Sequence, residues 1–106
     1  MYNINMKYKI LQAKTNEAFL CYSKAFSYER AKARDFTLND YYVVYESFCK
    51  KKEGKKEVEF YLGEIYYKFC NKLPKNFRGH TLCVGDIIEL DNTKYFINTI
   101  GFSKID

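Results

Sequence analysis

The sequence predicts an α+β fold, with a mainly antiparallel sheet of four or five strands and two helices. Two observations lead to this prediction. Three segments are rich in β-branched and aromatic residues, and the last two of them are joined by a short polar turn at Asp91-Asn92. A fourth segment, Val58–Asn71, repeats apolar residues with the 3.6-residue period of a helix.

Length and charge limit the classes of protein that fit. The chain has 106 residues, which predicts a single domain over residues 1–106. Its formal charge of +5 permits a nucleic acid or an acidic protein as partner but does not by itself indicate either. The first twelve residues do not resemble a signal peptide, and no segment approaches the roughly 20 apolar residues of a membrane span. We therefore expect a cytoplasmic protein without a membrane partner.

The cysteines and the histidine do not form a recognisable metal or redox motif. Cys21, Cys49, Cys70 and Cys83 are separated by long, unequal gaps, so we expect reduced thiols. Because His80 is the only histidine, a metal site would have to gather Cys and Asp ligands from distant positions. We expect neither a metal nor a cofactor.

The first forty residues contain one clear strand signal and one helix signal. The segment Lys7–Gln12 is compatible with a strand, and Phe19–Tyr22, which Asn16 can cap, fits either a strand or a helix. Alanines and charged residues of good helix propensity predict a helix over Lys24–Arg34. Turn-forming residues predict a break over Asp35–Asp40.

Next, a strand leads into a basic loop. Tyr41–Phe48 is dense in Tyr and Val and gives the strongest strand signal of the chain. The following run, Cys49–Lys56, is interpreted as a solvated connection. The alternative is a loop that contacts phosphate groups and whose affinity falls steeply with salt. The lysines that would make those contacts are Lys51, Lys52, Lys55 and Lys56.

The amphipathic segment Val58–Asn71 predicts a helix that ends before Pro74, because the residue preceding a proline is disfavoured in the α conformation. Gly63 lies inside this helix, where glycine costs up to about 1 kcal/mol relative to alanine. We expect that glycine occurs at this position because the helix packs closely against a strand there.

Two further strands are predicted over Leu82–Leu90 and Lys94–Ile100, with Gly101-Phe102 closing the second. In the first strand, Asp86 falls on the apolar face. A bulge or tight turn at Gly85-Asp86 resolves this conflict, with the carboxylate bonded to nearby backbone N–H groups. The apolar residues of that face are Leu82, Val84, Ile88 and Leu90.

Candidate chemistry concentrates in the same stretch. His80, Cys83 and Asp86 resemble a nucleophilic set, but on an extended strand Cys83 would point to the opposite face. We therefore expect no catalytic residue and no enzymatic activity. Arg78 and His80 are binding candidates, since both can donate to an anion. In the structural alternative, His80 bonds a backbone carbonyl and Arg78 pairs with an acidic residue.

Several motifs together resemble the YodL-like domain, a family of small bacterial proteins and modules. They are Asn76-Phe77-Arg78-Gly79-His80, the run Thr81–Ile88, and Tyr95 followed by Gly101-Phe102. Cys83 and Gly85 stand where the family pattern has serine. The residues to which we assign a structural role are Phe77, Gly79, Asp86, Gly101 and Phe102, which match the family pattern, and Gly85, which departs from it.

The resemblance implies an accessory protein of a mobile element or prophage, without an enzymatic activity to carry over. We expect it to bind and to inhibit or modulate a host protein, namely a defence nuclease or its complex, as anti-CRISPR and anti-restriction proteins do. The alternative is a module that binds nucleic acid or a nucleotide signal through the basic loop together with Arg78 and His80.

Overall fold

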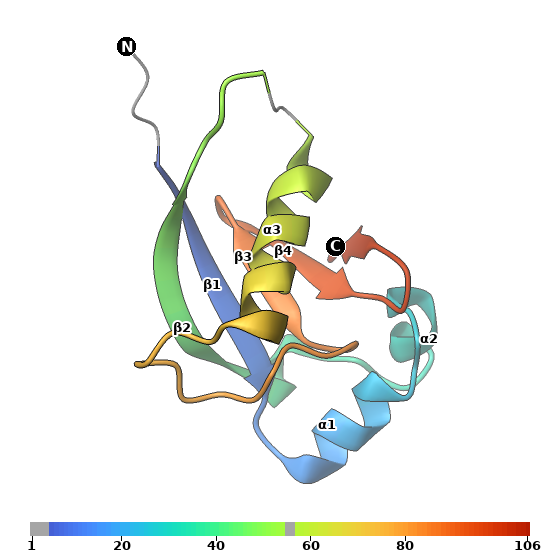
Figure 1. Cartoon of the computed structure of the whole chain (residues 1–106). Coiled ribbons are helices and arrows are strands. Elements are labelled where there is room, and N and C mark those ends of the chain that lie inside the picture. Colours follow the sequence, from blue (N-terminus) through green and yellow to red (C-terminus); the bar gives the residue numbers. More distant parts are fainter. Residues whose placement is uncertain (1–4, 55–56) are drawn as a thin grey trace.

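A computed structural model describes residues 5–54 and 57–106 (Figure 1). It confirms an α+β fold built on an antiparallel sheet, with two helices of eight and fourteen residues and one shorter helix. The strands and helices are β1 (Asn5–Ala13), α1 (Asn16–Ser23), α2 (Tyr28–Lys32), β2 (Tyr41–Lys50), α3 (Val58–Asn71), β3 (Ile87–Leu90), β4 (Thr93–Ile97) and β5 (Phe102–Lys104).

The five strands lie in the order β2-β1-β3-β4-β5, and every neighbouring pair is antiparallel. Strands β2 and β5 are therefore the two edges of the sheet. The pairing of β1 with β2 shifts between Ile10, opposite Tyr45, and Leu11, opposite Val43. Val44 is the extra residue of this bulge, which bends the edge strand.

Helix α3 packs across one face of the sheet (Figure 1). Phe69, at the centre of this contact, is fully buried and meets the rings of Tyr8, Tyr45 and Phe77. The core on this side is thus rich in aromatics. Its buried residues are Tyr8, Ile10, Tyr61, Leu62, Ile65, Phe69, Leu82, Ile88, Leu90 and Ile97.

The opposite face is half covered. Tyr22 and Tyr28, from α1 and α2, pack there against Leu11, Tyr41 and Phe96. The rest of this face carries lysines and glutamates, which pair across neighbouring strands, and the exposed ring of Phe48 opposite Lys7. These pairs are Lys7–Glu46 at 3.2 Å, Lys94–Glu89 at 3.1 Å and Lys9–Glu89 at 4.0 Å.

The predicted helix over Lys24–Arg34 is wrong in its first half. The chain turns at Phe26, whose φ is 71°, so the helix starts only at Tyr28. Two contacts from the β4–β5 turn hold this break: the N–H of Thr99 donates to Phe26 at 2.8 Å, and the side chain of Asn98 accepts from the N–H of Tyr28 at 2.8 Å. Tertiary contacts thus override the local helix propensity.

The start of the chain is close to the prediction. Strand β1 covers Lys7–Gln12 and extends it at both ends. The open choice for Phe19–Tyr22 is resolved as a helix, but its N-cap is Thr15, whose hydroxyl accepts from the N–H of Ala18, and Asn16 is the first helical residue.

Helix α3 begins and ends at the predicted residues, but the expected reason for Gly63 is wrong. A Cβ atom placed on Gly63 would meet nothing within 4 Å, so no close packing requires glycine there. None of the helices in the described chain is long and apolar enough to cross a membrane.

The last two predicted strands are shorter than expected. Only Ile87–Leu90 is a strand, because the residues before it form a loop that turns at Gly85. The turn at Asp91-Asn92 is confirmed, with φ values of 51° and 71° that fit a type I′ hairpin. Strand β4 ends at Ile97, and the chain returns as the additional strand β5.

Candidate functional site

The loop before β3 brings His80, Cys83 and Asp86 together. One ligand atom of each lies within 4.8 Å of the others. The prediction that Cys83 points away from His80 and Asp86 is wrong. Side chains alternate between two faces only where the chain is extended, and this loop is not. Here the N–H of Asp86 donates to the carbonyl of Cys83 at 3.0 Å, which closes a turn. The expectation that Cys and Asp groups would lie far from the histidine fails for the same reason.

Asp86 is the buried member of the cluster, with 1% of its surface exposed. Its Oδ2 accepts from the N–H of Cys83 at 2.9 Å and from the amide nitrogen of Gln12 at 3.1 Å. The prediction that this carboxylate bonds a nearby backbone N–H is confirmed. Burial raises the pKa of Asp86 to about 7, against the lowering effect of these hydrogen bonds and of His80.

Gln12, on β1, connects the loop to the sheet. Its side chain accepts from the N–H of His80 at 3.1 Å and donates to the carbonyl of His80 at 2.8 Å. A Cβ atom on Gly79 would collide with the Gln12 side-chain oxygen, so only glycine fits this approach. Sequence reasoning missed Gln12. The sequence carried one signal for it: Gln12 continues the alternation of Tyr8 and Ile10, so a polar side chain falls on the apolar face of the strand.

One ring nitrogen of His80, Nδ1, is hydrogen-bonded within the loop. This nitrogen lies 2.7 Å from the carbonyl oxygen of Thr81 and 3.2 Å from the side-chain amide nitrogen of Gln12. Because the carbonyl oxygen can only accept and is the nearer group, we assign the proton to Nδ1, which then donates to Thr81. The prediction that His80 bonds a backbone carbonyl is thereby confirmed. Cys83 Sγ at 4.0 Å and Asp86 Oδ2 at 3.7 Å approach the same nitrogen. A catalytic triad needs its nucleophile and its carboxylate at opposite ring nitrogens, so this geometry is not a triad.

The thiol of Cys83 is not activated. Its sulfur donates to the carbonyl of Thr81 at 3.2 Å. Burial raises the pKa of Cys83, and the nearby Asp86 and Cys70 raise it further. A nucleophilic cysteine needs the opposite shift, toward a thiolate at neutral pH.

The residues assigned a structural role pack or turn the chain. Gly85 has a φ of 95°, and a Cβ atom there would lie 2.8 Å from the backbone of Tyr22. The hydroxyl of Tyr41 donates to the Gly85 carbonyl at 2.5 Å. Phe77 packs on the core rings Tyr45 and Phe69. Gly101 accepts from the N–H of Asn98 at 3.0 Å, and the ring of Phe102 meets Tyr66.

The remaining binding candidates are not brought together. Arg78 is exposed and makes no ion pair with the described part of the chain. Lys52 pairs with Glu64 at 2.9 Å, and Lys51 is exposed. The basic loop precedes α3 whereas Arg78 follows it, and a helix of 14 residues is about 21 Å long (Figure 1). The two other lysines of the predicted site, Lys55 and Lys56, lie outside the described residues.

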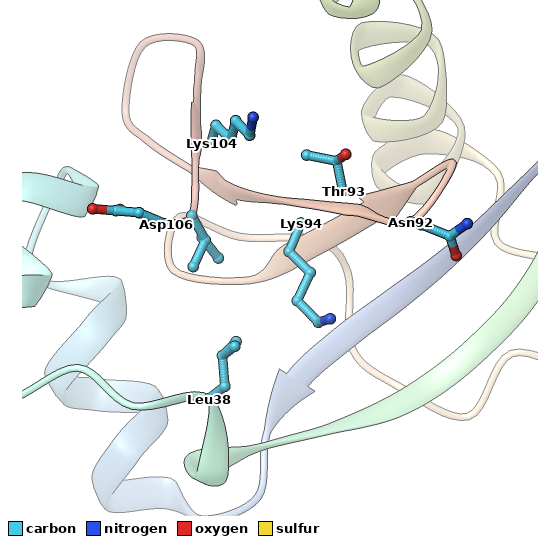
Figure 2. A pocket seen from close by; sticks show the side chains of 7 residues that line it. Leu38, Asn92, Thr93, Lys94, Lys104 and Asp106 are labelled. Carbon is cyan, nitrogen blue, oxygen red and sulfur yellow. The ribbon is translucent and has the colours of Figure 1, made fainter.

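A shallow hollow of about 250 Å³ lies beside the β3–β4 turn and the C-terminal residues (Figure 2). Two of its charged groups already have structural partners. Lys94 pairs with Glu89 at 3.1 Å, and Asp106 accepts from the hydroxyl of Tyr28 at 2.8 Å. None of the predicted site residues lines it. The lining residues are Leu38, Asn92, Thr93, Lys94, Lys104, Ile105 and Asp106.

The most exposed apolar feature of the sheet is its β2 edge. Strand β2 is ten residues long and pairs only with β1. In the described chain, no backbone hydrogen bond joins β2 to any segment other than β1. Phe48 is 61% exposed, and Tyr42 and Val43 are exposed as well. We call this feature the β2 edge.

A family model described as the YodL-like domain matches residues 7–106, nearly the whole chain. The chain belongs to this family. No curated protein and no solved structure matches it. Within this YodL-like domain, the loop around His80 and the β2 edge are the two features whose geometry calls for a functional explanation.

Proposed function

We propose that this YodL-like domain is a non-enzymatic accessory protein of a bacterial mobile element or phage. It binds a host protein in the cytoplasm and inhibits or modulates it, and the target class is a defence nuclease or its complex. The observation that supports this proposal best is the β2 edge, where a long strand exposes both its backbone and its apolar side chains.

Edge strands present unpaired N–H and C=O groups, and proteins usually shorten, charge or cover them. The β2 edge is only partly protected in this way. The bulge at Val44 interrupts it, and Glu46 and Lys50 carry charges, but six residues follow the bulge without interruption. Phe48 lies in this run, and a partner would bury its exposed ring.

The occupant that fits is an extended segment of the target, added to the sheet as a sixth strand. Backbone hydrogen bonds supply affinity in this mode, and side chains on alternate positions supply specificity. An apolar side chain of that segment would lie beside Phe48. An acidic side chain would lie near Lys50 and Lys51, where β2 enters the basic loop.

The proposal is tested by affinity capture from host lysate with three baits under several salt conditions. The wild-type protein and an Ile100→Lys variant are expected to retain the same specific protein, since Ile100 is 90% exposed and lies in the β4–β5 turn. A Val43→Lys, Phe48→Lys variant is expected to lose it. Capture of no specific protein by the wild type, or equal capture by all three baits, contradicts the proposal.

The alternative, nucleic-acid binding, has less support. Among its described candidate residues, the lysines precede α3 and Arg78 and His80 follow it, and Lys52 is already paired with Glu64. A binding groove would instead bring basic side chains together along one path. Gel shifts at low salt, with and without charge reversal of Lys51, Lys52, Lys55 and Lys56, distinguish the two. Binding that is abolished by the reversal would favour the alternative.

A further inference from the structure

The loop before β3 places three different metal-binding side chains at the spacing of a chelating turn. His80, Cys83 and Asp86 are each separated by two residues, and an x₂ spacing is common among zinc ligands in tight turns. Their nitrogen, sulfur and oxygen atoms lie within 4.8 Å of one another. We propose that these three side chains bind a divalent transition metal of the zinc class.

The distances suit such an ion after a small adjustment. Bonds of about 2.0–2.3 Å in a tetrahedron place two zinc ligands about 3.3–3.7 Å apart. His80 Nδ1 lies 3.7 Å from Asp86 Oδ2 and 4.0 Å from Cys83 Sγ. Because the side chain of His80 is 43% exposed and that of Cys83 is partly exposed, both can move inward by rotation.

The surroundings hold the least mobile ligand in place. Asp86 is anchored by the N–H of Cys83 and by Gln12, which is the kind of hydrogen bonding that orients metal-bound carboxylates. A cation would also offset the cost of burying this carboxylate. The carbonyl oxygen of Thr81, 2.7 Å from His80 Nδ1 and 3.2 Å from Cys83 Sγ, is a fourth donor atom beside the site.

Metal binding at this site must release one proton and relocate another. The thiol of Cys83 releases its proton to solvent, and the proton on His80 Nδ1 moves to Nε2, so that Nδ1 becomes an acceptor. Both protons now point at the carbonyl of Thr81, so their loss frees that oxygen to face the ion. Zinc and cobalt accept this mixture of imidazole, thiolate and carboxylate ligands.

The test is titration of the full, reduced chain with Zn²⁺ and with Co²⁺. Because the chain has a single histidine, the imidazole signals in an NMR spectrum belong to His80 without ambiguity. We expect one equivalent of Zn²⁺ to shift these signals, and one equivalent of Co²⁺ to produce a thiolate-to-metal charge-transfer band. Unchanged His80 signals at one equivalent of Zn²⁺ would overturn the proposal.

Matched cysteine variants assign the thiolate. Cys83→Ser, a conservative change, should abolish the charge-transfer band and weaken Zn²⁺ binding at least about tenfold, which is the scale of effect seen even for residues that only orient ligands. The variants Cys21→Ser and Cys49→Ser keep Cys83 and should behave as wild type. A band that persists in Cys83→Ser but disappears in either control would place the metal elsewhere and refute the assignment.

Discussion

The two edges of the sheet differ in length and in what they expose. Strand β5 has three residues, and the chain bonds back to β4 directly after it, through the N–H of Ile105 and the carbonyl of Lys94 at 2.9 Å. Strand β2 has ten residues and exposes Tyr42, Val43 and Phe48. A short edge gives another chain little to pair with, so β5 is better protected than β2.

The β2 edge also differs from the loop around His80, the other candidate site among the described residues. The loop around His80 satisfies its hydrogen bonds internally, through Gln12, Thr81 and Asp86. Among the described segments, only β1 forms hydrogen bonds with the backbone N–H and C=O groups of β2. We therefore base the proposed function on the β2 edge and treat the loop as a structural device with a separate metal-binding capacity.

The largest expected effect is on the free energy of unfolding, when the aromatic contact between α3 and one of the two edge strands is removed. Tyr45 of β2 packs on the buried ring of Phe69, whereas β5 contacts α3 through the half-buried Phe102 and Tyr66. Phe69→Ala should lower the free energy of unfolding by about 3–5 kcal/mol, the range for a buried aromatic. Phe102→Ala should cost clearly less. Chemical denaturation measures both, and equal losses would show that the two edges are supported alike.

The next effect separates binding from stability. Phe48→Lys places a charge on the β2 edge, and we expect it to weaken binding of the captured host protein by about 30-fold, or about 2 kcal/mol, as the loss of a central contact does. Its unfolding free energy should stay within about 0.5 kcal/mol of wild type. A charge change on the other edge, Lys104→Glu, should leave affinity unchanged. Similar losses for both variants would remove the contrast between the edges.

A smaller effect is expected in α3, away from both edges. Gly63→Ala should raise the free energy of unfolding by up to about 1 kcal/mol, because the new methyl group meets nothing within 4 Å and alanine favours the helix. Binding of the host protein should not change. A loss of stability in thermal or chemical denaturation would contradict the account of this glycine.

The smallest effect is electrostatic. Lys51→Glu reverses one exposed charge where β2 enters the basic loop, and should slow association with an acidic partner several-fold while leaving dissociation nearly unchanged. Surface plasmon resonance at two salt concentrations measures both rates. Lys14→Glu, at the other end of β1, is the control with the same change of net charge. If both variants slow association equally, the effect comes from the total charge of the protein and not from the position of Lys51.

The sequence predicted elements whose local pattern is strong. Helix α3 and the turn at Asp91-Asn92 follow from periodicity and turn chemistry, and both are confirmed. Tertiary hydrogen bonds set the break at Phe26, so local propensity could not reveal it. The alternation of side chains between two faces likewise fails where the chain is not extended, which is why Cys83 was wrongly predicted to point away from His80 and Asp86.

Neither edge of the sheet could be predicted from the sequence. The order β2-β1-β3-β4-β5 depends on pairing between strands far apart in the chain, and the Tyr41–Phe48 signal is the same for a central and an edge strand. The residues that now carry the proposal, Val43 and Phe48, therefore became candidates only once the sheet order was known.

Hydrogen exchange along the sheet tests the central claim most directly. The amides of this chain are compared in the free protein and in its complex with the host protein retained by affinity capture. An added strand should slow exchange of the outward-facing amides of β2, above all after Val44, and leave β5 unchanged. Protection that appears elsewhere while β2 exchanges as in the free protein would contradict binding through the β2 edge.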